Sequence, residues 1–149
     1  DKDGNTRPIH TKNAEKVLHF ERDSQWVKEN IAIEPILIEE GEGYKEYVVG
    51  RTELMYYETH RIELDTHAAY HGQFTVITVV DGEQVKVYSK SRPEFCYTAN
   101  FLDIVTIPAD IDDYVIEAQS YQPAVVHKVI LREGYSRYKN PDYKNRKKD

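Results

Sequence analysis

The stretch that decides the fold is residues 74–88, FTVITVVDGEQVKVY. Residues 74–80 are all β-branched or aromatic, the composition of a buried β-strand. Asp81-Gly82 is a two-residue turn signal, and the largely apolar residues 85–88 predict a second strand after it. We therefore expect a β-hairpin here, inside a β-rich fold.

Short segments rich in β-branched and aromatic residues extend to both sides of this stretch. They are 33–38, 47–49, 54–64, 95–97, 104–107, 114–116 and 125–131. Pro35 predicts that the first of them is an edge strand, because proline has no N–H for a sheet ladder. Eight or nine short strands with a single early helix predict an all-β antiparallel sandwich or barrel.

Only the beginning of the chain has helical periodicity. Ala14, Val17 and Leu18 share one helix face after the N-cap residue Thr11, so we expect a helix over 12–19. The chain is then expected to divide into three parts. They are a linker segment whose short helix packs on the barrel (1–30), the barrel itself (31–131) and a basic, flexible tail (132–149).

Composition excludes several classes of protein. The chain has 149 residues, 40% hydrophobic and 31% charged, which indicates one folded domain and argues against disorder. The longest apolar run is four residues, so no membrane span is expected. Residues 1–131 hold 13 Lys/Arg and 23 Asp/Glu, and so acidic a body is not expected to bind nucleic acid. The single Cys96 suits a reducing compartment, and we expect a cytoplasmic protein.

The order of turns in the second half of the chain resembles the cupin family. The matching residues are VVDGE at 79–83, DIVTIPA at 103–109 and the strand YVIE at 114–117. Leu102 stands where the cupin pattern has glycine. The resemblance implies a cupin-type double-stranded β-helix, or jelly roll, which agrees with the strand count.

A narrower resemblance lies upstream, in DKDGNTRPIH at 1–10 and the apolar helix residues that follow it. It is similar to the segment that opens the short helix before the C-terminal cupin of class I mannose-6-phosphate isomerases. The stretch YYETHRIEL at 56–64 also resembles that half. The resemblance covers about residues 1–131 and implies a parent enzyme that interconverts mannose 6-phosphate and fructose 6-phosphate with zinc. Since the polar start lacks an initiator Met, we expect a piece of a longer protein.

A metal-binding cupin has two histidines two residues apart, a glutamate shortly after them and a late third histidine. Counted from Gly82, the first three positions fall on Ala69, His71 and Thr75, and the last falls among residues 112–114. At most one of four ligands remains, whereas zinc requires three or four. We therefore expect no cofactor within this chain, and the resemblance implies that zinc belongs to the parent enzyme.

The other histidines are weaker metal candidates. His67 and His71 are four residues apart, about 14 Å along a strand, so they meet only if the chain between them curls. Ordinary surface or loop positions are the alternative. An unusual ligand set drawn from His60, His67, His71 and His127 also stays open.

Arg7 and His10 are the weak candidates for catalysis because they belong to the isomerase-like segment. Arginine offers a bidentate fork to a phosphate or carboxylate, and histidine offers a proton. Alternatively, both residues fix the linker against the barrel. Glu58, Glu63 and Asp65 could form an acid pair for sugar chemistry, although carboxylates on the outer face of a strand are commoner.

Two functions are compatible with these residues. In the first, the chain is the C-terminal, metal-free cupin region of a mannose-6-phosphate isomerase-like enzyme and is inactive alone. Its partner is then an N-terminal metal-binding cupin domain or a second copy, and it forms part of a cleft for a sugar phosphate. In the second, it is a stand-alone, non-catalytic sugar-binding or regulatory cupin.

Overall fold

The computed structural model describes residues 2–6, 8–52 and 55–132. They divide into two units that are described separately, one up to Ile33 and one from Glu34 onward. None of the helices in these ranges is long and apolar enough to span a membrane.

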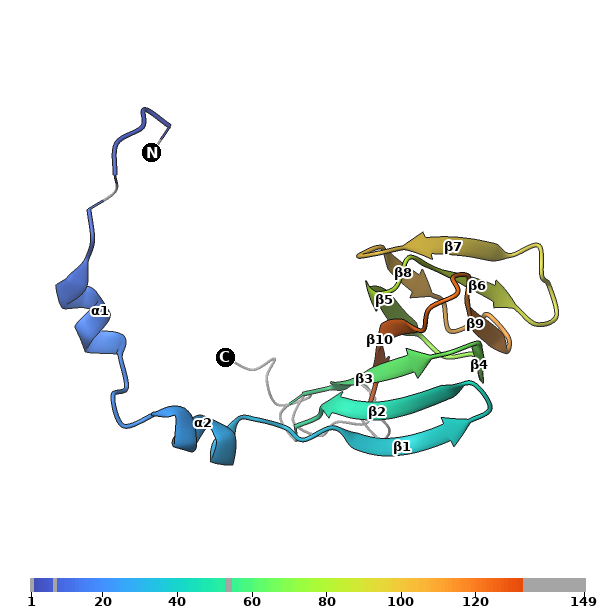
Figure 1. Ribbon diagram of the computed structural model, residues 1–149, viewed down its shortest axis with the longest axis horizontal. Helices are drawn as coiled ribbons and strands as arrows, with labels where there is room; N and C mark the ends of the chain where they lie inside the picture. The colour runs from blue at the N-terminus through green and yellow to red at the C-terminus, as the bar shows by residue number, and fades with distance from the viewer. Residues whose placement is uncertain (1, 7, 53–54, 133–149) are drawn as a thin grey trace, which may run out of the picture. The chain divides into compact units, whose positions relative to one another are not determined.

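The first unit has two short helices, α1 (Thr11–Val17) and α2 (Ser24–Asn30) (Figure 1). The sequence predicts only one helix, and the second is an addition. α2 forms because Asp23 caps its start, with a carboxylate oxygen accepting the N–H of Trp26 at 2.8 Å. The N-cap of α1 is His10, one residue before the expected one. The packing of this segment on the barrel stays a prediction.

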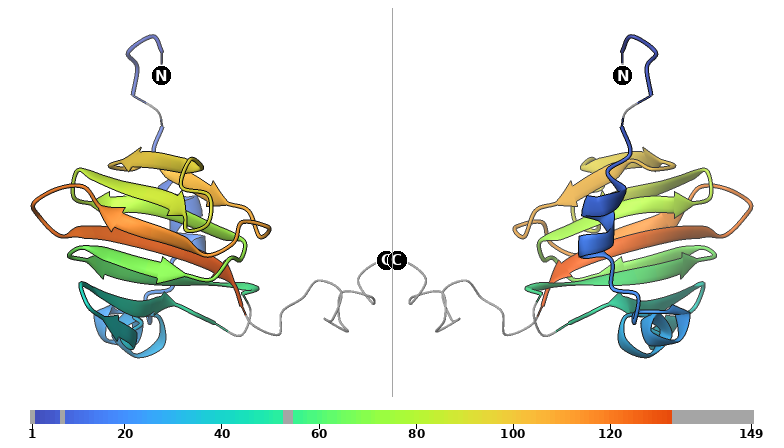
Figure 2. Two further views of the ribbon diagram at one scale, coloured as in Figure 1. Left: turned by 90° about the vertical axis from the view of Figure 1, so that its right-hand side faces the viewer. Right: turned by 90° about the vertical axis from the view of Figure 1, so that its left-hand side faces the viewer.

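The second unit consists of two antiparallel sheets, seen from three sides in Figure 1 and Figure 2. One sheet has the strand order β1-β2-β3-β10-β5-β8, and the other has the order β4-β9-β6-β7. The strands are β1 (Ile36–Gly41), β2 (Tyr44–Gly50), β3 (Tyr57–Leu64), β4 (His67–Tyr70), β5 (Thr75–Asp81), β6 (Gln84–Ser89), β7 (Cys96–Asn100), β8 (Ile104–Ile107), β9 (Tyr114–Ala118) and β10 (Ala124–Leu131). The predicted all-β, two-sheet architecture is confirmed.

Most strands lie where the sequence predicts them. β1 follows Pro35 and is the edge strand of its sheet, as expected. The sequence misses β4 because its residues, HAAY, include no β-branched side chain. β4 pairs with β9, and its Ala68 is fully buried, so tertiary packing defines this strand.

The turn at Asp81-Gly82 forms, but the expected hairpin does not. Gly82 has a φ of 87°, and its N–H donates to the Asp81 carboxylate at 2.8 Å. β5 pairs with β10 and β8, whereas β6 pairs with β7 and β9 in the other sheet. The turn therefore carries the chain across the core. Val79 before it and Val85 after it are both fully buried because they pack between the sheets.

The core between the sheets is apolar toward the end of the barrel where β3 stops and β10 starts. Its fully buried aliphatic residues include Ile62, Leu64, Ile77, Val79, Val85, Ile116 and Val126. Beside this apolar part, three inward positions of β2, β3 and β10 are polar, since Glu46, His60 and Lys128 are buried there. Burying charged groups is unfavourable unless they are paired, so this part of the core requires a specific arrangement of partners.

Leu102 has a φ of 66°, and it is the single non-glycine residue with positive φ in the described ranges. It lies in the tight turn between β7 and β8, where its N–H donates to the Val79 carbonyl at 2.8 Å. This is the position at which the cupin pattern has glycine. The left-handed conformation is unfavourable for an L-residue with a Cβ, by about 1–2 kcal/mol.

We predict that Leu102→Gly raises the free energy of unfolding by about 0.5–1 kcal/mol, since relief of the left-handed strain exceeds the entropy that glycine loses on folding. The Leu102 side chain is 61% exposed, so little buried area is lost. Urea denaturation measures the change. Leu102→Ala is the control, because it removes the side chain but keeps the Cβ, and an equal gain in both variants would contradict the explanation.

Candidate functional site

The weak catalytic candidates belong to the first unit. Arg7 lies outside the described residues. His10 is exposed at the start of α1, and its side chain makes no capping hydrogen bond there. A joint role for the two residues stays a prediction.

The histidine candidates for a metal are spread over the barrel. His67 is the exposed first residue of β4, and His71 follows β4 with its side chain 97% exposed and Nδ1 2.9 Å from the Asp113 carboxylate. His60 is buried inside the barrel, whereas His127 points to the other face of its sheet, since its neighbour Lys128 points inward. Among the described residues, no three His, Cys, Asp or Glu side chains gather closely enough to hold a metal ion.

The positions counted from the cupin metal pattern make two separate contacts in the fold. Thr75 is fully buried, and the Tyr114 hydroxyl donates to Thr75 Oγ1 at 3.3 Å. His71 meets Asp113, next to Tyr114 in the chain. Two hydroxyls, an exposed histidine and the one carboxylate that it contacts do not supply the three or four converging ligands that zinc takes. The residues at these positions therefore do not fit the metal that the family resemblance implies.

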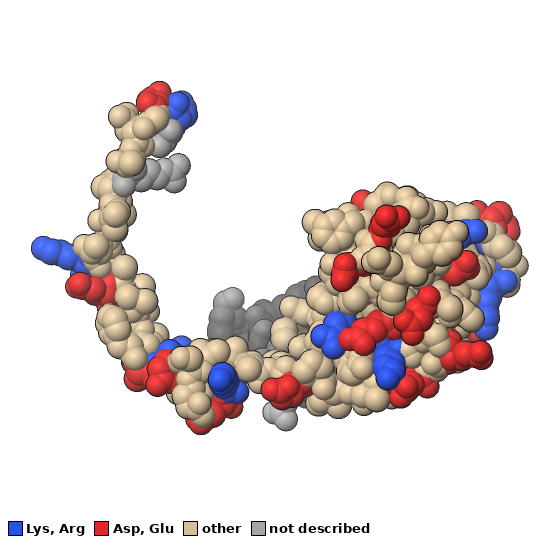
Figure 3. Space-filling view, viewed as in Figure 1, with Lys and Arg blue, Asp and Glu red and all other residues tan. Residues whose placement is uncertain are grey.

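The main concentration of chemistry in the barrel is Glu46, His60 and Lys128, which we call the interior cluster. Charged side chains are spread over the outside of the barrel (Figure 3), but these three residues are only 1%, 3% and 4% exposed. They converge because β2, β3 and β10 are neighbours in one sheet, with His60 directly opposite Lys128. Alternation along each strand then points all three side chains into the core.

The Glu46 carboxylate is the centre of the cluster. Its Oε1 accepts a hydrogen bond from Lys128 Nζ at 2.6 Å and also contacts His60 Nδ1. On the other side of the imidazole, His60 Nε2 lies 3.2 Å from Glu58 Oε1. Both ring nitrogens thus lie near carboxylate oxygens.

The aromatic side of the cluster is Tyr70 on β4. Lys128 Nζ lies 3.8 Å from the centre of the Tyr70 ring, within the range of a cation–π interaction. The Tyr70 ring packs against Tyr114, with 5.6 Å between ring centres. The interior cluster therefore contacts, through two tyrosines, the place where the cupin pattern would put its metal ligands.

The charges of the cluster shift the pKa values of its members. Burial acts to raise the pKa of Glu46, but the His60 hydrogen bond and the Lys128 charge outweigh it and lower the pKa to about 2. Burial lowers the pKa of Lys128, and the Glu46 charge offsets this only in part. Burial, followed by the Glu46 charge, raises the pKa of the Tyr70 hydroxyl. For the Glu46–Lys128 pair, the cost of removing both charges from water and the attraction between them are therefore both large.

At the edge of the cluster, Glu58 Oε2 pairs with Arg51 Nε at 3.2 Å, whereas the buried His60 Nε2 has no hydrogen-bond partner among the described residues. A carboxylate, an imidazole and an ammonium are the groups of acid–base chemistry. All three are shielded from solvent here, however, and the ammonium repels any added divalent cation. The arrangement is that of a structural ion pair buried inside the barrel.

From the sequence, His60 is expected only in an unusual metal-ligand set and Glu58 only in an acid pair, and Glu46 and Lys128 are not singled out. Lys128 could be recognised in the sequence from its place in the alternation of inward and outward residues along the strand. It lies two residues after Val126 and two before Ile130, so a period of two places it on the inward face. The same phase relates Glu46 to Val48.

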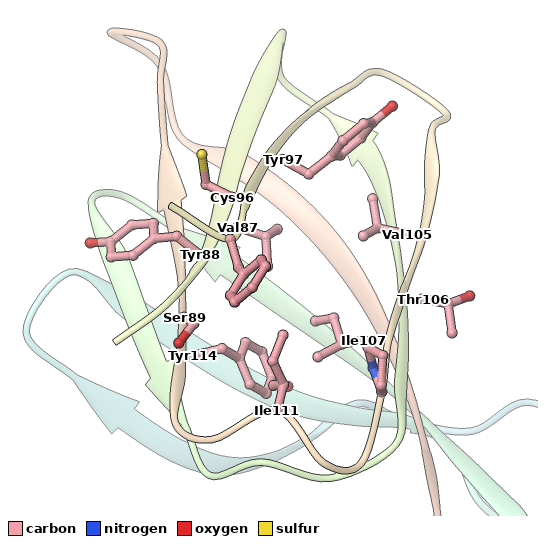
Figure 4. A pocket seen from close by; sticks show the side chains of 12 residues that line it. Val87, Tyr88, Ser89, Cys96, Tyr97, Val105, Thr106, Ile107, Ile111 and Tyr114 are labelled. Atoms are coloured by element: carbon pink, nitrogen blue, oxygen red, sulfur yellow. The ribbon is translucent and has the colours of Figure 1, made fainter. Parts of the chain in front are cut away.

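A pocket of about 250 Å³ opens between β6, β7, β8 and the loop from β8 to β9 (Figure 4). Ile107, Ile111 and Tyr114 lie on one side of it, and Cys96 and Tyr97 lie on the opposite side. Because Tyr114 also packs on Tyr70, the pocket and the interior cluster share a wall.

We predict a loss of stability in acid that depends on Glu46. Its pKa is about 2 in the folded state and 4.5 ordinarily, so its contribution is complete above pH 4.5 and is lost as the pH falls toward 2. The free energy of unfolding should fall by about 3 kcal/mol more in the wild type than in Glu46→Gln over that range. Urea titrations at several pH values measure this, and parallel curves for the two proteins would refute it.

We predict that Lys128→Met lowers the free energy of unfolding by about 3–5 kcal/mol, since it leaves a buried carboxylate without its main cation. Adding Glu46→Gln to this variant should recover at least about 1 kcal/mol, because the unpaired charge is then gone. Lys45→Met is the matched control on an exposed lysine that pairs with Glu40, and it should change stability by less than about 1 kcal/mol. Additive losses in the double variant would contradict the pairing.

The sequence matches no protein-family model and no curated protein. Solved structures, by contrast, share its fold. A cupin-2 domain protein from Rhodospirillum rubrum has a TM-score of 0.54 and 13% identity over 67% of this chain and 70% of that one. A cupin-superfamily sugar phosphate isomerase from Silicibacter pomeroyi has a TM-score of 0.50 and 16% identity over 67% of this chain and 71% of that one.

The mannose 6-phosphate isomerase from Bacillus subtilis is also similar, with a TM-score of 0.59 and 16% identity over 86% of this chain. The match spans only 36% of that isomerase. Identities this low establish the fold alone. The two antiparallel sheets and these neighbours together show that the chain has a cupin-type jelly-roll fold.

Proposed function

We propose that this chain is the metal-free cupin region of a mannose-6-phosphate isomerase-like protein, where it supports a metal-bearing cupin and forms part of its substrate cleft. The observation that carries the proposal is the interior cluster. Lys128 supplies a fixed positive charge inside the barrel, bonded to Glu46 at 2.6 Å. A barrel neutralised in this way needs no metal to hold its buried carboxylate.

The reaction of such an enzyme requires more than this barrel offers. Aldose–ketose isomerisation needs a group that polarises the carbonyl, commonly a metal, and a base that moves a proton between neighbouring carbons. Glu46, His60 and Lys128 are shielded from solvent by at least 96%. We therefore assign the chemistry to a separate metal-bearing cupin and a supporting role to this chain.

The similarity to the Bacillus subtilis isomerase supports the choice of parent. It extends over 86% of the chain, whereas the barrel, residues 34–132, makes up about two thirds of it. A sugar phosphate is accordingly the proposed substrate of the assembled protein. The exposed free thiol of Cys96 suits the cytoplasmic location that the proposal includes.

The edge strand β1 supports the presence of a partner. Ile36, Leu37 and Ile38 are consecutive, and each of them is 47–60% exposed. Exposed apolar residues on an unpaired edge are unfavourable in a free-standing domain and are usually covered. The proposed occupant is the metal-bearing cupin or a second copy.

We predict that the full chain, prepared without a histidine tag, contains less than about 0.1 zinc ions per chain and does not turn over mannose 6-phosphate with added zinc, because the cupin ligand positions hold Thr75 and Tyr114. Elemental analysis and a coupled isomerase assay measure this, with the Bacillus subtilis enzyme as positive control. Stoichiometric zinc with turnover would overturn the proposal, and His60, His67, His71 and His127 would then become the first candidates for ligands.

Light scattering distinguishes the proposal from a stand-alone sugar-binding or regulatory cupin. A region that lacks its partner should self-associate through its exposed apolar edge. A monodisperse chain that binds mannose 6-phosphate without metal, measured by calorimetry, would instead favour the stand-alone module.

A further inference from the structure

The pocket beside Tyr114 lies on the open side of the sandwich. β7 is the last strand of one sheet and β8 the last strand of the other, so the two sheets are not joined by strand pairing there. The side chains of Val87, Ile107 and Tyr114 are buried, and the pocket extends inward to them. The pocket is thus open to solvent and has buried core side chains at its base (Figure 4).

The chemistry of the lining excludes charged and strongly polar ligands. None of the twelve lining residues is charged. Ser89 Oγ donates to the Asp112 carboxylate at 2.6 Å and accepts the Arg92 N–H at 3.0 Å. The Tyr114 hydroxyl is bonded to Thr75. Burial and then a hydrogen bond to Glu117 raise the pKa of Tyr88, so its hydroxyl is engaged as well.

A sugar phosphate would therefore find no charged side chain for its phosphate in this pocket, and the hydroxyls of Ser89, Tyr88 and Tyr114 already have partners. A buried polar group without a partner loses several times the energy of an average hydrogen bond. An apolar ring has no polar groups whose hydrogen bonds to water would be lost. It would also contact the aromatic side chains of Phe95, Tyr97 and Tyr114.

Size narrows the ligand further. An apolar cavity of about 150 Å³ is enough for benzene, and drug-sized ligands occupy pockets of about 300 Å³ or more. At about 250 Å³, this pocket fits one single or fused ring system. The Tyr97 hydroxyl points away from the pocket centre (Figure 4).

We infer that the pocket between β7 and β8 is a binding site for a small, uncharged aromatic molecule. Binding in this pocket requires neither a metal nor a partner chain. The exposed Cys96 and Phe95 lie at its rim, so a ligand enters from solvent without unfolding the barrel.

Indole and p-cresol are suitable probes. In amide-resolved NMR of the full chain, indole should shift the signals of Val87, Val105 and Ile107 with a Kd of about 1 mM or below. Mannose 6-phosphate at the same concentrations should leave these signals unchanged. The inference fails if indole shifts none of them, or if mannose 6-phosphate shifts them or competes with indole.

Val105→Phe fills the pocket and should weaken indole binding at least tenfold. Ile104→Phe is the matched control on the next residue of β8, where the side chain is 72% exposed, and it should leave the Kd within twofold. Ile111→Trp, in the loop after β8, is a second filling variant if Val105→Phe does not fold. Indole binding that survives a folded filling variant would overturn the inference, whereas the metal and turnover assay of the proposed function would be unaffected.

Discussion

The bond between Lys128 and Glu46 is the constraint on which the arrangement of the barrel depends. A lysine and a glutamate that are each nearly inaccessible to water are tolerated only as a pair. Lys128 is on β10 and Glu46 on β2, and β3 lies between these strands with His60 facing both. The contact therefore requires that Glu46 on β2, His60 on β3 and Lys128 on β10 all point into the core.

The same contact specifies strand register more sharply than hydrophobic packing does. A shift of β10 by one residue would turn Lys128 outward and place His127 in the core, without its present partners. Aliphatic neighbours such as Val126 and Ile130 tolerate small changes of packing, because contacts between them are not directional. The directional contact between the buried charges thus restricts the register of β10.

The sequence predicted the strands well because alternation and β-branched composition are local signals. It failed where partners had to be chosen. The turn at Asp81-Gly82 has the composition of a hairpin, but its strands belong to opposite sheets, a choice made by the distant strands β8, β9 and β10. The cupin pattern has glycine at the position of Leu102. The positive φ of Leu102 explains this preference, because glycine adopts such a conformation without strain.

The site was predicted less well than the fold. Counting residues from Gly82 identified one real contact, between Thr75 and Tyr114, but it could show only which metal ligands are missing there. Glu46 and Lys128 were overlooked because charged residues are ordinarily assigned to the surface. Their burial depends on a pairing between residues 82 positions apart, which no local pattern reveals. The role of Arg7 and His10 is still a prediction.

The position of β10 has a consequence for biosynthesis. This strand comes last among the ten, yet it fills the middle of the larger sheet, between β3 and β5. While the ribosome is still making it, the inner edges of β3 and β5 have no partner, and Glu46 has no lysine. The sheet can close only after residues 124–131 have emerged, so the nascent barrel must be protected from aggregation until its last strand arrives.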